Sequence, residues 1–79
     1  MRTLYVGGLN PETTADRLRD LFEQFGGISE ARVVLRPRTG KCRGFGYVTF
    51  LLDRDALHAM NELDGRVVRG DRLRVDLAR

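Results

Sequence analysis

The side chains that could carry chemistry in this sequence are aromatic rings and arginines. Arg43, Phe45 and Tyr47 alternate with small or apolar residues, and Tyr5 stands in a short apolar segment near the start of the chain. Flat rings beside guanidinium groups suit a planar, anionic partner, because rings stack on planar π systems while arginine binds phosphate in a fork geometry. The pattern therefore predicts a binding surface.

The sequence contains few residues that could catalyse a reaction or bind a metal. His58 is the only histidine, and Cys42 is the only cysteine, sixteen positions before it, so they do not form a metal site. Cys42 lies between Lys41 and Arg43, but no general base accompanies it to make it a catalytic nucleophile. We interpret Cys42 as an incidental exposed thiol. The expectation is a protein that is not an enzyme and that uses no cofactor, no metal and no small-molecule substrate.

The positive charge is concentrated in one segment. The net charge of the 79 residues is +3, but residues 32–50 contain five basic side chains and no acidic one. A solvated loop would explain this segment equally well by itself, whereas a local basic patch in a small domain is typical of proteins that bind polyanions. The five residues are Arg32, Arg36, Arg38, Lys41 and Arg43.

The elements that position these residues follow from hydrophobic periodicity. Strands are expected at residues 4–6, 28–36, 43–50 and 73–77. One helix begins after Thr13 or Thr14 and continues to Phe25, and a second begins at Asp53 as its cap and ends before Gly65. The apolar stripes of the two helices are Leu18, Leu21, Phe22 and Phe25, then Ala56, Ala59, Met60 and Leu63.

The order βαββαβ predicts an α+β, ferredoxin-like fold. Right-handed crossovers place both helices on one face of a four-stranded antiparallel sheet, with strand order 4-1-3-2. The other face is left open. Residues 1–79 are expected to form a single domain, and no apolar run approaches the roughly 20 residues that span a bilayer.

Alternation along residues 43–50 decides which aromatic residues lie on the open face. If Phe45 and Tyr47 were in the core, Arg43 would be buried beside them, which is costly for an unpaired charge. We therefore expect Val48 and Phe50 to point inward, with Gly44 and Gly46 on the same face letting a helix pack closely. Phe45 and Tyr47 then lie on the open face, and the same alternation places Tyr5 there.

These residues carry a family resemblance. Residues 43–50, RGFGYVTF, match at every position the RNP1 octapeptide of the RNA recognition motif (RRM) family, and residues 4–9, LYVGGL, resemble its RNP2 hexapeptide. The similarity continues through residues 18–26, 39–41 and 70–75 and covers the whole chain. It implies a monomer that binds short single-stranded RNA, about two to four nucleotides, in RNA metabolism or post-transcriptional regulation.

The resemblance also implies roles for individual residues. Tyr5 and Phe45 would each stack on a base, and Tyr47 would pack between sugars or against a neighbouring base. Arg43 would pair with phosphate, and Lys41, Arg36 and Arg38 would hold the backbone from their loop. The residues able to read base edges or to extend the surface would be Arg32, Val34, Arg74, Asp76 and Arg79.

Some alternatives stay open. Single-stranded DNA offers the same stacking and phosphate contacts. An RRM-like module that binds protein is the second reading. Leu51, Leu52 and Leu57 either fill the edge of the core or form a small apolar patch for a protein partner or weak self-association. The expected location is intracellular: cytoplasmic for a bacterial chain, and nuclear, cytoplasmic or both for a eukaryotic one.

Overall fold

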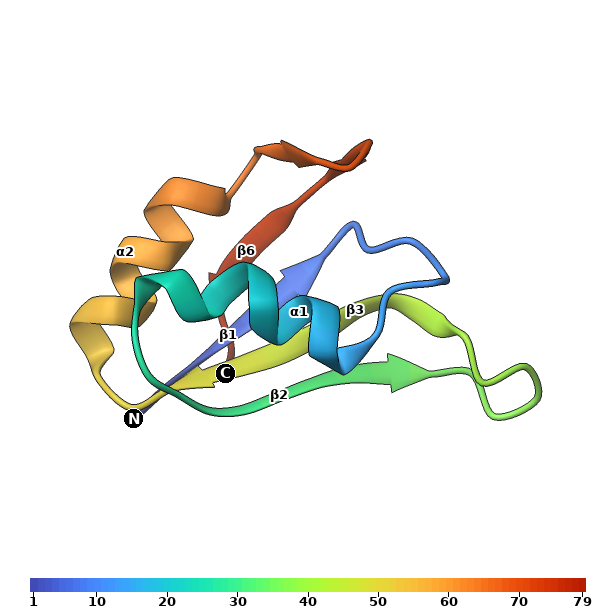
Figure 1. Ribbon diagram of the computed structural model, residues 1–79, viewed down its shortest axis with the longest axis horizontal. Helices are drawn as coiled ribbons and strands as arrows, with labels where there is room; N and C mark the ends of the chain where they lie inside the picture. The colour runs from blue at the N-terminus through green and yellow to red at the C-terminus, as the bar shows by residue number, and fades with distance from the viewer.

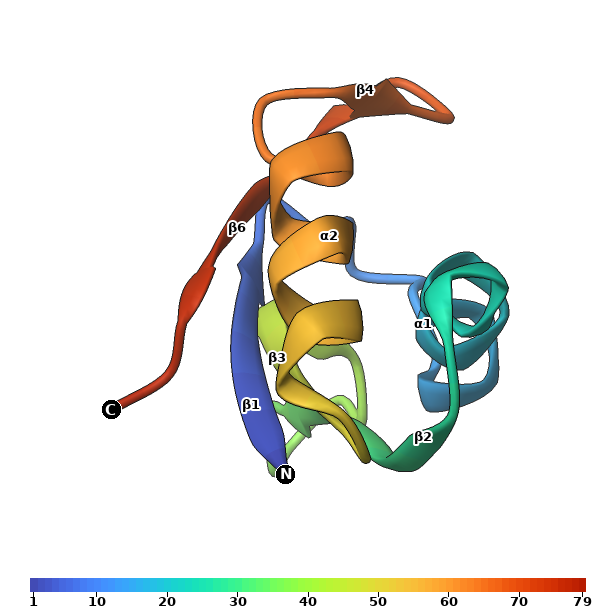
Figure 2. The same cartoon turned by 90° about the vertical axis from the view of Figure 1, so that its left-hand side faces the viewer.

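A computed structural model describes residues 1–79 as a sheet with two helices on one side (Figure 1). The neighbouring strands pair antiparallel in the order β2-β3-β1-β6, which confirms the predicted fold and strand order, β6 being the fourth strand of the sheet. The strands are β1 (Arg2–Gly7), β2 (Ile28–Leu35), β3 (Cys42–Phe50) and β6 (Arg74–Leu77). The helices are α1 (Ala15–Phe22) and α2 (Asp53–Leu63). Figure 2 shows both helices on the same side of the sheet and none on the other.

A two-stranded ribbon interrupts the path from α2 to β6. It pairs β4 (Val67–Val68) with β5 (Asp71–Arg72), neither of which was among the four expected strands. Arg69 (φ 52°) and Gly70 (φ 86°) make the two-residue turn. Positive φ at both central residues is the conformation that the right-handed twist of a hairpin favours.

Helix α1 is anchored by its cap and by its apolar stripe. The Thr14 side chain accepts a hydrogen bond from the backbone N–H of Arg17 at 3.2 Å, which settles the choice between Thr13 and Thr14. Leu18 and Phe22 are buried in the core. The α-helix ends earlier than predicted, at Phe22, and a 3₁₀ turn, η1 (Glu23–Phe25), completes the stripe with Phe25 packed on the core.

Helix α2 lacks the side-chain cap that the sequence suggested. Leu52, not Asp53, occupies the N-cap position, with extended backbone (φ −114°, ψ 133°) and no capping hydrogen bond. Asp53 is already the first helical residue, and its carboxylate lies within 3.7 Å of the N-terminal ammonium group and 3.6 Å of the Arg2 guanidinium. The predicted capping role of Asp53 is therefore wrong.

The core lies between the sheet and the helices and contains no charged side chain. Phe22 of α1 and Phe50 of β3 meet edge to face, with ring centroids 6.3 Å apart. Cys42 belongs to this core at 3% exposure, which corrects the prediction of an exposed thiol. Strand β3 begins one residue earlier than expected, so Cys42 shares the inward face with Val48 and Phe50. Neither helix is long and apolar enough to cross a membrane.

Candidate nucleic-acid interface

Three aromatic rings gather on the helix-free face of the sheet. The register of β1 and β3 places Tyr5 opposite Tyr47 and Gly7 opposite Phe45. Ring centroids are 5.9 Å apart for Tyr5 and Phe45, 6.1 Å for Tyr5 and Tyr47, and 6.2 Å for Phe45 and Tyr47. All three rings are half-buried. Tyr5, Phe45 and Tyr47, called the ring cluster below, form a compact triangle of partly exposed π surface.

Strand alternation separates the ring cluster from the core. The inward residues of the same strands, among them Leu4 and Val48, are fully buried. Gly46 lies between Phe45 and Tyr47, and a Cβ there would be 2.4 Å from the Arg32 carbonyl oxygen and 3.2 Å from Leu18. This glycine therefore allows the close approach of β2 and α1. Gly44 serves a different purpose from the one predicted, because it has a φ of +102° and lies beside the loop after β1, near Leu9, rather than a helix.

Gly7 is a contributor that the sequence analysis missed. It follows Tyr5 by two residues on the same face, and a Cβ at Gly7 would lie 2.5 Å from the Tyr5 Oη. The missing side chain gives the Tyr5 ring room to lie across β1. The signal was available, because alternation places Gly7 beside Tyr5 on the open face.

Arg32 extends the ring cluster toward β2. It pairs with Tyr47 in the register of β2 and β3, and its guanidinium carbon lies 4.7 Å from the Tyr47 ring centroid. A guanidinium at this distance makes a cation–π contact. Val34 lies on the same strand, half-buried, where the register shifts between Val33 and Leu35.

The other edge of the ring cluster is formed by β6. Asp76 is the register partner of Tyr5, and Arg74 is the partner of Gly7. Both side chains are exposed, as is Arg43 at the start of β3. None of these three, nor Arg32, takes part in an ion pair. Their charges are therefore free to meet a ligand.

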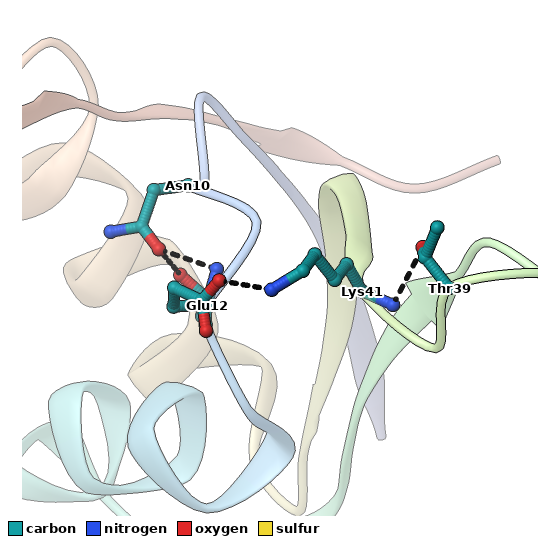
Figure 3. Close-up of polar contacts among 5 residues, drawn as sticks. Asn10, Glu12, Thr39 and Lys41 are labelled. Carbon is teal, nitrogen blue, oxygen red and sulfur yellow. Dashed lines mark hydrogen bonds and ion pairs between the residues drawn. The ribbon is translucent and has the colours of Figure 1, made fainter.

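The exposed Lys41 side chain points toward the loop after β1. Its ammonium group pairs with the Glu12 carboxylate, and the backbone N–H of Glu12 donates to the Asn10 Oδ1 at 2.8 Å (Figure 3). The hydrogen bond and charge of Lys41 hold the pKa of Glu12 below its ordinary value of 4.5. Sequence reasoning missed Glu12, because the partners are 29 residues apart and lie in different loops.

The remaining predicted residues lie at opposite ends of the sheet. Arg36 and Arg38 are exposed in the loop between β2 and β3, which closes through a hydrogen bond from the Gly40 N–H to the Arg36 carbonyl at 2.8 Å. Arg79 is exposed beyond Ala78, whose N–H donates to the Thr3 carbonyl at the far end of β1. The structure thus groups the rings with Arg32, Arg43, Arg74 and Asp76, and leaves Arg79 apart from the loop arginines.

The far end of the open face is polar. The hydroxyl groups of Thr3 and Thr49 hydrogen-bond at 2.8 Å, and Glu30 is the register partner of Thr49 on β2. None of these three was among the predicted site residues. No group of three or more histidine, cysteine, aspartate or glutamate side chains could hold a metal ion.

Known proteins similar to this chain share its fold and its sequence pattern. Glycine-rich RNA-binding protein 4, mitochondrial, from Arabidopsis thaliana is 41% identical over 75 residues, which make up 95% of this chain and 55% of that protein. Small ribosomal subunit protein uS19m from the same plant is 38% identical over 76 residues, 96% of this chain and 36% of that protein. The chain thus spans only part of the length of these relatives.

Solved structures superpose closely on this one. RNA Binding Protein PG1 gives a TM-score of 0.94 at 36% identity, covering 99% of this chain and 94% of that one. The Sex-lethal protein in complex with RNA gives 0.92 at 33% identity, covering 99% and 47%. The second RRM domain of the yeast poly(U)-binding protein gives 0.90 at 33% identity, covering 100% and 95%.

The profile of one family accounts for nearly the whole chain. The RNA recognition motif profile matches residues 4–74, which include most of β1 with Tyr5, all of β3 with Phe45 and Tyr47, and both helices. The matched residues include the ring cluster and most of the sheet beneath it, and β6 is matched only at Arg74. This chain belongs to the RNA recognition motif family.

Proposed function

We propose that the chain binds short single-stranded RNA on the open face of its sheet and takes part in RNA metabolism or post-transcriptional regulation. The observation that carries the proposal is the ring cluster: three half-buried aromatic rings, each about 6 Å from the others, on a face that no helix covers. A domain this small needs its apolar side chains in the core, so rings left on an open face indicate a binding surface.

Stacking supplies the largest part of the interaction. Tyr5 and Phe45 each take one base, and Tyr47, held under the Arg32 guanidinium, packs against sugars or a neighbouring base. Each stacked base contributes about 1–3 kcal/mol and is tolerant of sequence. Three stacked bases give about 3–9 kcal/mol before ordering costs, a range that includes the roughly 8 kcal/mol of micromolar binding.

Charged side chains around the ring cluster hold the backbone and the base edges. Arg43 pairs with a phosphate beside Phe45. Arg36, Arg38 and Lys41 contact the strand where it passes the β2–β3 loop, Lys41 after exchanging Glu12 for phosphate. The residues left to read base edges or extend the surface are Val34, Arg74, Asp76 and Arg79.

Membership of a nucleic-acid-binding family, rather than a family of enzymes, supports this proposal. The Sex-lethal protein was solved with RNA, and a mitochondrial relative is named for RNA binding. We extend the proposal to a monomer inside a cell, with single-stranded DNA as an alternative ligand that offers the same stacking and phosphate contacts.

One observation favours a second function beside the first. Leu51, Leu52 and Leu57 are 53%, 48% and 38% exposed, so the interpretation that they fill the edge of the core is wrong. We keep a weak protein contact at these leucines as a second candidate function, which does not use the ring cluster.

An NMR titration tests the main proposal. The ¹⁵N-labelled chain is titrated with a pool of random RNA pentamers at two salt concentrations. We expect shift changes at Tyr5, Phe45 and Tyr47 that weaken at the higher salt. Changes confined to Leu51, Leu52 and Leu57, or none at all, would contradict RNA binding on the sheet.

A variant separates stacking from folding. Phe45→Ala should cost about 1–3 kcal/mol of RNA binding and leave the thermal unfolding midpoint nearly unchanged, because the ring stands outside the core. Phe50→Ala is the matched control, since the fully buried Phe50 ring should cost about 3–5 kcal/mol of stability. Unfolding of Phe45→Ala to the same extent as Phe50→Ala would place Phe45 in the core and refute the face assignment.

A further inference from the structure

Asp76 places an acceptor-only group beside the Tyr5 ring. Tyr5 and Asp76 are direct partners in the antiparallel pair of β1 and β6, so their side chains stand on the same face. Cβ atoms of such partners lie about 4.5–5.5 Å apart. A base that stacks on Tyr5 therefore has an edge within reach of the Asp76 carboxylate, an arrangement that rests on the function proposed above.

The carboxylate is only partly satisfied within the protein. Its Oδ1 accepts a hydrogen bond from the backbone N–H of Leu77 at 2.8 Å, and its Oδ2 has no hydrogen-bond partner. Arg74 precedes Asp76 by two residues on the same face but forms no ion pair with it. The first bond fixes the carboxylate, and the second oxygen is left to accept from a ligand.

A hollow runs from Tyr5 and Asp76 around the β6 edge of the sheet toward α2. It has a volume of about 400 Å³, which is within the range of small-ligand pockets. Its lining includes Tyr5, Arg74 and Asp76 from the sheet, and Met60, Asn61 and Asp64 from α2 and the residue after it.

The four bases differ in what they offer a carboxylate. Ionised aspartate only accepts hydrogen bonds. Uracil presents its single N3–H between two carbonyl oxygens, which the carboxylate repels. Cytosine and adenine present an exocyclic amino group, and guanine presents N1–H and the N2 amino group side by side, so one carboxylate can take both.

We propose that Asp76 is a specificity-determining residue, which makes the Tyr5 subsite select bases that carry an exocyclic amino group, guanine foremost, and disfavour uracil. This preference would set the chain apart from the yeast poly(U)-binding protein, whose second RRM domain has the same fold. The discrimination is expected at one position only, because a single carboxylate faces the ring cluster from β6.

Fluorescence anisotropy with defined pentaribonucleotides tests the inference. The dissociation constants of UUUUU, CCCCC and UUGUU are compared, since uracil and cytosine are both pyrimidines and stack on similar areas. For the unmodified chain we expect CCCCC and UUGUU to bind about tenfold more tightly than UUUUU, as for one good base contact. In Asp76→Asn the ratios should fall to near one, because an amide both donates to and accepts from uracil.

Glu30→Gln is the matched control for charge. It removes the same charge from the open face at the opposite edge, beside Thr49. This variant should bind all three RNAs more tightly by the same factor, so the ratios of their dissociation constants stay unchanged. Equal affinities for the three RNAs in the unmodified chain, or ratios that survive in Asp76→Asn, would overturn the role of Asp76 and leave RNA binding standing. Failure of the unmodified chain to bind any of the pentamers would overturn the proposed function itself.

Discussion

The pair of Glu12 and Lys41 joins two loops at the edge of the proposed interface and makes them sensitive to acid. The pKa of Glu12 is lowered from 4.5, first by the hydrogen bond to Lys41 and then by its charge. A carboxyl with a lowered folded-state pKa stabilises the fold above its unfolded-state value, and the contribution is lost as the pH falls through the folded-state pKa.

Glu12→Gln should therefore weaken the dependence of the free energy of unfolding on pH in this range. Above pH 4.5 the unmodified chain should be slightly more stable than the variant, and the difference should vanish as the pH falls below the lowered pKa of Glu12. The effect is small because both side chains are largely exposed. Thermal unfolding at pH values from about 3 to 6 measures it, with Glu62→Gln on α2 as a control. An equal difference at every pH would contradict the pairing.

At the scale of the residue, local alternation was predictable and contacts between loops were not. The faces of Tyr5, Phe45 and Tyr47 followed from the period of a strand and from the cost of burying Arg43. Cys42 was misplaced only because β3 begins one residue earlier than its RNP1 pattern. The partnership of Glu12 with Lys41 depends on how two loops meet in space, and no local pattern encodes that.

At the scale of the element, α2 begins without a side chain that satisfies its free N–H groups. Leu52 already has the extended backbone of an N-cap residue, and its side chain is 48% exposed. Leu52→Asn should supply the missing acceptor and raise the free energy of unfolding by about 1 kcal/mol. Leu51→Asn is the control, since Leu51 is equally exposed but does not occupy the cap. Chemical denaturation measures both, and equal effects would show that capping is not the cause.

Helices and strands were predictable from periodicity, whereas their ends depended on competing partners. The stripe of α1 was predicted through Phe25, yet the backbone tightens into a 3₁₀ turn after Phe22 while the same apolar contacts remain. Asp53 was expected to cap α2, but the N-terminal ammonium group and Arg2 attract its carboxylate. The β4–β5 ribbon was missed because Arg69 is not a residue expected at positive φ.

At the scale of the whole molecule, the basic segment of residues 32–43 gathers at one end of the sheet. Arg32 and Arg43 lie on the sheet, and Arg36 and Arg38 lie in the loop beyond it. Arg38→Ala should weaken the binding of every RNA by a similar factor and reduce the slope of log affinity against log salt by about 0.7. Arg66→Ala, in the connection between α2 and β4, is the control with the same charge change. Equal slopes in the two variants would exclude a phosphate contact at Arg38.

The arrangement of the molecule was the most predictable level of all. Handedness of the crossovers and the order of the elements leave few ways to join four strands and two helices, so the sheet order followed from the sequence pattern. The position of Arg79 did not, because the chain after β6 follows β1 away from the loop arginines. Arg79 and the loop arginines lie at opposite ends of the sheet, and only the pairing of the strands shows this.

The buried thiol of Cys42 offers a way to measure local opening of the fold by chemical labelling. Because Sγ is in the core, a thiol reagent reacts with it only while the start of β3 is detached, so the labelling rate measures the free energy of that opening. The same strand carries Phe45 and Tyr47, and a ligand that binds only the closed form slows the labelling in proportion to its occupancy. Mass spectrometry of one unmodified cysteine would thus follow ligand binding to the opposite face of the sheet without any attached dye.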